Sequence, residues 1–151
     1  MDSELINTWG LDWGWGLPLV VFTVIFHAYG LGLIYRATST LGHTRRRHIS
    51  QNSILAIGVT SLAAIVLHAL ESAMWAVAYQ LLGALPNYKS AMLYSLNALT
   101  SYGHASLHLA PRWELMGALE ALNGWILFGL TTAFLFTVLQ KAWNSASPVN
   151  A

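Results

Sequence analysis

The chain has no cysteine and few charged residues, and both facts exclude some classes of protein. Without cysteine there is no disulfide framework and no thiolate metal site. Charged residues make up 9% of the 151 residues and hydrophobic residues 56%. A soluble domain carries about 25% charged residues. The net charge is +1, and the one basic run, residues 45–47, is too short for a phosphate-binding face. We therefore expect a membrane protein that binds no nucleic acid.

The first residues also lack the basic stretch that opens a cleaved signal peptide. They carry acidic residues instead, and they carry tryptophans, which favour the membrane–water interface. The acidic residues are Asp2, Glu4 and Asp12, and the tryptophans are Trp9, Trp13 and Trp15. We expect residues 1–16 to form an extracytoplasmic interfacial segment, followed by a first hydrophobic segment that stays as an anchor.

Three segments are long and apolar enough to cross a bilayer. A helix crossing the roughly 30 Å hydrocarbon core needs about 20 mostly apolar residues. Residues 17–36, 53–83 and 113–141 meet this requirement. We expect Pro18 near the start of the first helix, where its missing N–H is harmless, and Pro86-Asn87 to end the second. The sequence predicts an all-α membrane protein with three transmembrane helices.

Residues 88–100 are apolar enough to enter the membrane but too short to cross it. They suit either a re-entrant pore helix or an amphipathic helix at the interface. In the first case the loop that follows must be buried in protein or line water, because lipid cannot satisfy a non-helical backbone.

The basic residues predict the orientation. Residues 36–48 contain four of the seven basic residues and no acidic ones, so the positive-inside rule assigns them to the cytoplasm. With three spans, the N-terminus and residues 84–112 are expected outside. Residues 144–151 are then a short cytoplasmic tail.

Residues 64–143 carry a series of short motifs in a fixed order. The motifs are Leu67-His-Ala-Leu-Glu71, Trp75-Ala-Val-Ala-Tyr79, Ala91-Met-Leu-Tyr-Ser95, Pro111-Arg-Trp113, Leu119-Glu-Ala-Leu-Asn-Gly124 and Phe128-Gly-Leu-Thr-Thr-Ala133. In this order and spacing the segment resembles the pore module of the two-transmembrane potassium-channel superfamily, specifically its small bacterial three-span members. The resemblance implies that residues 53–143 form a pore module of outer helix, pore helix, filter loop and inner helix. Residues 17–52 then supply a first span and a basic cytoplasmic loop.

The same resemblance implies a function and a setting. It implies a homotetramer in the bacterial inner membrane that conducts a monovalent cation, K⁺ or Na⁺, passively. No enzymatic activity and no resident cofactor or metal are expected. Two alternatives stay open: a non-conducting structural or regulatory subunit of the same fold, and a haem- or metal-binding electron-transfer protein.

The filter motif of the family is altered in this chain. That motif reads Thr-Thr-x-Gly-Tyr-Gly-Asp, and an ungapped alignment places residues 100–106 on it. Thr100 and Gly103 match, Ser101 keeps a hydroxyl, and Tyr102 replaces a small β-branched residue. The last three positions, for Tyr, Gly and Asp, are taken by His104, Ala105 and Ser106. The family's filter presents rings of backbone carbonyls.

These substitutions predict weak or altered potassium selectivity. A left-handed Ala105 would cost on the order of 1 kcal/mol in each subunit. Ser106 removes an acidic ring that would concentrate cations at the outer mouth. His104 and His108 either lower conduction when acid protonates them, or only form local hydrogen bonds or face water.

Ionisable residues also occur inside the spans. His68 and Glu71 are three residues apart, hence on one helical face, and can pair with each other or with His27. Glu120 and Asn123 form a similar face on the third span. This buried polar network either packs helices together or responds to protons. A rival interpretation takes the two histidines and two glutamates as metal or haem ligands, but only His68 and Glu71 have ligand-like spacing.

The third span offers candidates for lining or gating a pore. Gly124 and Gly129 suit either a gating bend or close helix packing. Thr131 and Thr132 are expected to line water below the loop, and Phe134 or Phe136 to form an apolar constriction; residues 130–139 suit contact with lipid equally well.

Overall fold

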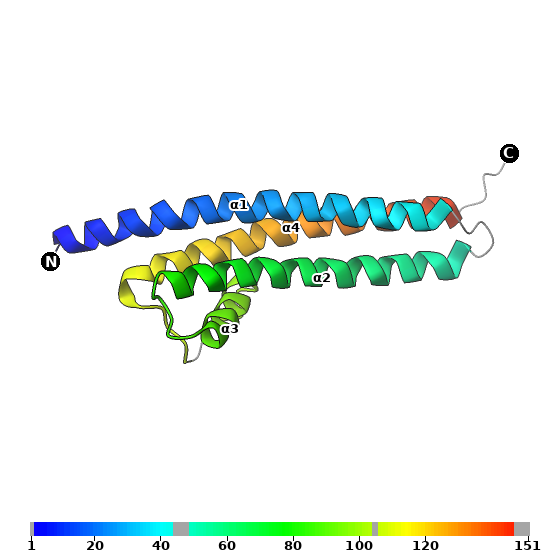
Figure 1. The fold of residues 1–151 in the computed structure, drawn as a ribbon. Helices are drawn as coiled ribbons and strands as arrows, with labels where there is room; N and C mark the ends of the chain where they lie inside the picture. The colour runs from blue at the N-terminus through cyan, green and yellow to red at the C-terminus, as the bar shows by residue number, and fades with distance from the viewer. Residues whose placement is uncertain (1, 44–48, 104–105, 147–151) are drawn as a thin grey trace.

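A computed structural model describes residues 2–43, 49–103 and 106–146. Three long helices lie side by side in it: α1 (Asp2–His43), α2 (Ile49–Leu81) and α4 (Glu114–Ala146) (Figure 1). A short helix, α3 (Tyr88–Leu99), lies beside one end of this bundle, and the 3₁₀ turn η1 (Pro111–Trp113) leads into α4. The described residues contain no strand. The predicted all-α class is confirmed.

Three stretches of these helices are long and apolar enough to span a membrane, as predicted. They are Trp9–Thr38, Ile54–Leu81 and Pro111–Lys141, of 30, 28 and 31 residues. Large apolar side chains such as Val21, Ile65 and Leu122 are more than half exposed on their outer faces. In water these side chains would be costly to expose, whereas lipid accepts them.

The first helix begins earlier than predicted. α1 starts at Asp2, so Pro18 lies in the helix interior and not near its start. An interior proline costs about 3 kcal/mol, because it removes a backbone hydrogen bond and crowds the preceding turn. α1 packs against η1 and α4, and Gly16, two residues before Pro18, lies against the side chain of Leu119; this packing offsets the cost. Asp12 is buried there, with its carboxylate placed to accept from the backbone N–H of Met116.

The second helix also ends before the predicted position. α2 stops at Leu81, and Gly83 follows in the left-handed region with φ +64°. The N–H groups of Gly83 and Ala84 bond back to the carbonyls of Gln80 and Tyr79 at 3.1 and 2.8 Å, which closes the helix end. Pro86-Asn87 therefore does not end α2. Asn87 instead caps α3, where its side chain accepts from the N–H of Ser90 at 2.9 Å.

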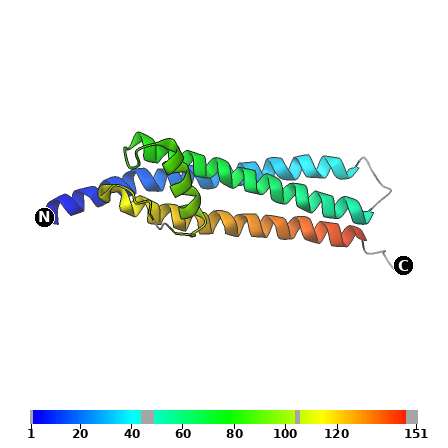
Figure 2. The ribbon, with the colours of Figure 1, turned by 90° about the horizontal axis from the view of Figure 1, so that it is seen from below.

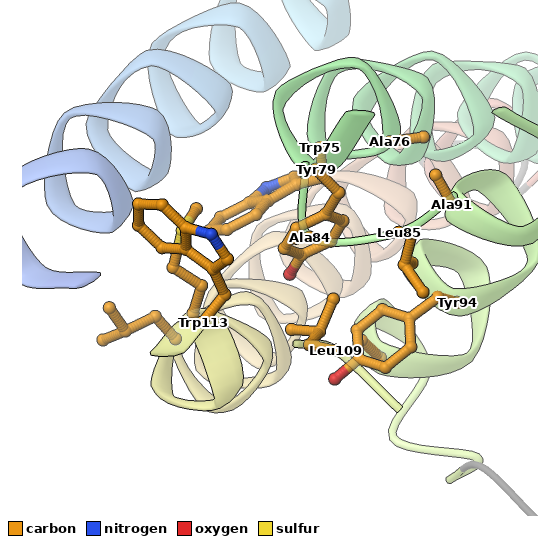
Figure 3. Close-up of a cluster of buried hydrophobic side chains, with 12 residues drawn as sticks. Trp75, Ala76, Tyr79, Ala84, Leu85, Ala91, Tyr94, Leu109 and Trp113 are labelled. Carbon is orange, nitrogen blue, oxygen red and sulfur yellow. The ribbon is translucent and has the colours of Figure 1, made fainter. Parts of the chain in front are cut away.

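A buried cluster of aromatic and small residues holds α3 in place (Figure 3). It gathers side chains from the end of α2, from α3 and from the start of α4. The ring of Tyr79 on α2 meets the ring of Tyr94 on α3 edge-on, with 5.4 Å between centroids. Such edge-to-face pairs add about 0.5–1.5 kcal/mol to the burial of the rings. The cluster packs α3 onto the bundle.

The helices run so that the two ends of the bundle differ. The start of α1, the end of α2, α3 and the start of α4 share one end (Figures 1 and 2). The end of α1, the start of α2 and the end of α4 share the other. The start of α3 and the start of α4 therefore lie nearer the opposite end from the end of α1 and the start of α2.

Candidate functional site

The C-terminal end of α3 rests against the backbone of α4. A Cβ atom added to Gly124 would overlap the carbonyl oxygen of Leu99, so only glycine allows this approach. Gly124 lies 13 residues after Pro111 and 17 before Lys141, the limits of the third candidate span. At 1.5 Å per residue, the contact is about 20 Å along the span from Pro111. α3 thus reaches the middle of the third span.

The chain leaves α3 through a tight left-handed turn. Ser101 has φ +54°, and its N–H bonds to the carbonyl of Ala98 at 2.9 Å. The N–H of Tyr102 bonds to the carbonyl of Asn97, also at 2.9 Å. This is a Schellman motif with serine at the position usually taken by glycine. A left-handed serine costs about 1–2 kcal/mol, and this strain falls at Ser101, where the sequence did not predict it.

A hydrogen bond from α4 holds the strained serine. The indole N–H of Trp125 donates to the Ser101 hydroxyl at 2.9 Å. Below the turn lies a groove of about 380 Å³ between the loop and one open face of α4. It is lined by Leu99, Thr100, Ser101, Trp125, Phe128, Gly129 and Thr132.

The residues predicted to form a filter are exposed where they are described. Thr100, Ser101, Tyr102, Gly103 and Ser106 all face outward, and Tyr102 is 84% exposed. Gly103 has φ +88°, a conformation that favours glycine. His104 and Ala105, including the predicted strain at Ala105, lie outside the described residues. His108 is exposed.

Glu120 ties α3 to α2 and α4. Its side chain is fully buried and accepts from the Tyr79 hydroxyl at 2.6 Å and from the Ser95 hydroxyl. Ser95 also lies 2.8 Å from the carbonyl oxygen of Ser72 on α2. Nearby, burial and then the carboxylates of Glu120 and Glu114 raise the pKa of the Tyr94 hydroxyl to about 12, so this phenol keeps its proton.

A second buried network joins α1, α2 and α4 nearer the middle of the bundle. His27 Nδ1 lies 2.7 Å from Glu71 Oε1, and His68 Nδ1 lies 3.2 Å from Glu71 Oε2. The two Nε2 atoms both point to the Thr131 hydroxyl, His27 at 3.0 Å and His68 at 3.1 Å. The ring of Phe128 stacks on His68 with 4.5 Å between centroids. We call His27, His68, Glu71 and Thr131 the imidazole–glutamate network.

The structure therefore divides the predicted polar network in two. His68 and Glu71 belong to the imidazole–glutamate network, whereas Glu120 has separate partners. Asn123 is buried near α1, where its amide donates to the Thr23 hydroxyl at 2.8 Å.

The predicted pore-lining residues also divide. Thr131 is buried inside the protomer, so it does not line an outer face. Gly129, Thr132 and Phe136 lie exposed on α4. Gly124 is buried against α3, which is a close-packing position.

Several residues of the site were not found from the sequence. They are Tyr79, Ser95, Thr23, Trp125 and Phe128. These residue types also occur in apolar helices without any role in a site. Apart from Tyr79, only the contact with another part of the folded chain identifies each of them as part of this site. Tyr79 alone carried a signal, since it lies one turn beyond Trp75 on the helix that holds Glu71.

The three apolar helices and the polar groups buried between them define a multi-pass helical membrane protein. No protein-family model, curated protein or solved structure matches the chain in comparisons with known proteins.

Proposed function

We propose that the protein is a pore-forming subunit, similar to potassium channels, that conducts monovalent cations passively with weak or altered selectivity. One observation carries the proposal. The loop after α3 lies beside Gly124, near the middle of the third span, on a face of α4 that the described residues of the protomer leave open.

Lipid does not accept such a loop. The hydrocarbon core has no hydrogen-bond partners, so irregular backbone at this depth must be covered by protein or line water. The exposed surfaces of Ser101, Tyr102 and Gly103 include backbone that no other described part of the chain covers. Other copies of the chain would cover part of this backbone, and a water-filled space between the copies would supply hydrogen-bond partners to the rest.

A symmetric ring supplies this arrangement. One protomer has too few helices to enclose a pore, and closed cyclic symmetry brings the same face of each copy to one axis. We assign the open face of α4, with Phe128, Gly129 and Thr132, to the region facing the axis. By resemblance to the potassium-channel pore module, the ring is a homotetramer.

Charge favours one orientation of this ring. Five of the seven basic residues lie near the end of α1, near the end of α4 or in the sequence between α1 and α2: Arg36, Lys141 and residues 45–47. We assign the end of the bundle where α1 and α4 end to the cytoplasm and α3 to a helix that enters from the other side. In bacteria the corresponding membrane is the inner membrane.

The turn at Ser101 supports altered selectivity. Residues 100–102 close the end of α3, with three N–H groups bonded back into the helix. Backbone in this conformation does not present a straight series of carbonyls to an axis, which a potassium filter uses to replace hydration water. We expect permeant ions to keep part of their hydration shell.

Ion flux in liposomes tests this function. The purified full chain should dissipate both a potassium and a sodium gradient, and a bilayer recording with the two ions on opposite sides should reverse near zero voltage. Trp125→Phe removes the indole N–H that holds Ser101 and should change the permeability ratio. Trp143→Phe, on an exposed tryptophan far from the loop, is the matched control.

The alternatives give different results. Reversal at the potassium equilibrium potential would contradict altered selectivity, and reversal at the chloride potential would contradict a cation pathway. Absence of flux from a folded oligomer would favour the non-conducting structural subunit.

A further inference from the structure

The imidazole–glutamate network contains two buried polar atoms that face each other. His68 Nδ1 and Glu71 Oε2 are 3.2 Å apart, both are buried, and neither has a hydrogen-bond partner among the described residues. The Glu71 side chain is fully buried and that of His68 is 11% exposed. A buried polar atom without a partner is costly, so this pair needs an explanation.

Counting protons shows what the network lacks. Its three hydrogen bonds join His27 Nδ1 to Glu71, Thr131 to His27 Nε2, and His68 Nε2 to Thr131. Two neutral imidazoles and one hydroxyl supply three protons, and an ionised carboxylate supplies none. These three protons fill the three hydrogen bonds. No proton is left for the fourth contact, between His68 Nδ1 and Glu71 Oε2. These two atoms therefore have no proton or other positive group between them.

We propose that this position binds a divalent transition-metal ion of the Zn²⁺ class, with His27, His68 and Glu71 as ligands. Each of the three offers one ligand atom, and the three atoms lie within 4.8 Å of one another. Two imidazoles and one carboxylate form a known set for zinc, whereas Mg²⁺ and Ca²⁺ prefer all-oxygen sites. The proposal rests on these contacts and not on ion conduction.

The three side chains must shift to give the ligand spacing of such an ion. Zinc bonds of 2.0–2.1 Å in a tetrahedral arrangement put ligand atoms about 3.3 Å apart. His68 Nδ1 already lies 3.2 Å from Glu71 Oε2, whereas the contact between His27 Nδ1 and Glu71 Oε1 must open from 2.7 Å. The widest separation among the three ligand atoms, up to 4.8 Å, must close toward the tetrahedral value. The proton on His27 then moves from Nδ1 to Nε2, so that Nδ1 presents its lone pair to the metal.

Thr131 is the positioning residue of this site. With the metal bound, its oxygen would use its two lone pairs to accept from both Nε2–H groups, and its own hydrogen would turn to a helix carbonyl. One oxygen thereby sets the tautomer and the ring orientation of both histidines. A metal-bound histidine usually has such a partner on its other nitrogen.

The site has one accessible side. His68 is the only partly exposed member of the ligand set. The ring stacked on it, Phe128, also lines the groove under the loop. The fourth coordination position is therefore expected to face Phe128 and to hold water.

Metal binding to the full chain tests the proposal. The protein is purified in detergent with a tag free of histidine, stripped with a chelator and loaded with Zn²⁺. We expect one tightly bound zinc per chain. Loading with Co²⁺ should give the intense visible absorption of a four-coordinate site. Wild-type protein that binds no stoichiometric zinc would overturn the proposal, and the network would then hold an extra proton instead.

Substitutions locate the site. His68→Ala and Glu71→Gln should each remove tight binding, whereas His108→Ala, on an exposed histidine outside the network, should not change it. Thr131→Val should weaken binding about 10- to 100-fold and shift the Co²⁺ spectrum. Equal loss in His108→Ala, or none in His68→Ala, would overturn the assignment. If the ligand variants fail to fold, the wild-type Co²⁺ spectrum decides, since weak six-coordinate absorption contradicts the site.

Discussion

At the scale of single residues, several polar groups buried in the protein have a hydrogen-bond partner on another helix. Glu120 accepts from Tyr79 on α2 and Ser95 on α3, so one carboxylate joins three helices. In a membrane this matters more than apolar contact, because lipid tails are as apolar as leucine and give helices no hydrophobic reason to associate.

Removing one of these hydroxyls tests its contribution. Tyr79→Phe leaves a buried carboxylate oxygen of Glu120 without a donor and should lower the free energy of unfolding by about 1–3 kcal/mol. Tyr29→Phe makes the same change on a tyrosine that is 67% exposed and should have little effect. Thermal unfolding of both variants in the same detergent measures the difference. Equal stabilities would contradict the importance of the Glu120 contacts.

At the scale of elements, the position of α3 depends on one close approach. The aromatic cluster determines which helices α3 packs against. The contact between Leu99 and Gly124 determines how far α3 reaches along α4. Because the approach is between backbones, flexible side chains cannot absorb an added atom by moving aside.

A pair of glycine substitutions tests this contact. Gly124→Ala puts a methyl group into the Leu99 carbonyl, so we expect a loss of about 1–3 kcal/mol in stability and a loss of ion flux. Gly58→Ala, on α2, meets nothing within 4 Å and should be neutral, or gain up to about 1 kcal/mol from the better helix former. Chemical unfolding and liposome flux are measured on both. Normal flux in Gly124→Ala would contradict the need for this packing.

At this scale the sequence predicted the number of long helices and the existence of the short one, because the lengths of apolar runs determine both. It misplaced where helices begin and end. Pro18 was tolerated inside α1, and Gly83 ended α2 before Pro86. Both outcomes depend on packing and on closing hydrogen bonds, which involve residues from other turns and other helices.

At the scale of the whole molecule, the open face of α4 and the loop above it are the part that a single protomer leaves incomplete. Groups on that face, Trp125, Phe128 and Thr132, line the groove with residues 99–101. In the proposed ring these faces meet around the axis.

The absence of cysteine makes this arrangement testable with single substitutions. Tyr102→Cys places one thiol on the loop, and oxidation in membranes should cross-link protomers into dimers. Ile65→Cys places a thiol on an exposed apolar position of α2 and should remain monomeric on a denaturing gel. Cross-linking at Ile65 alone would contradict the placement of the loop at the axis.

The sequence by itself determined the membrane class, the three spans and the short helix between the last two, since these follow from composition and from the length of apolar runs. The identities of polar residues also showed that His68, Glu71, Glu120 and Asn123 would need partners. Only the tertiary structure decided which partners they have. It brought His27, 44 residues from Glu71, into contact with it and placed Thr131 between the two histidines. Helix packing sets such contacts through the rotation and depth of each helix, and neither is encoded in the spacing of residues along one helix.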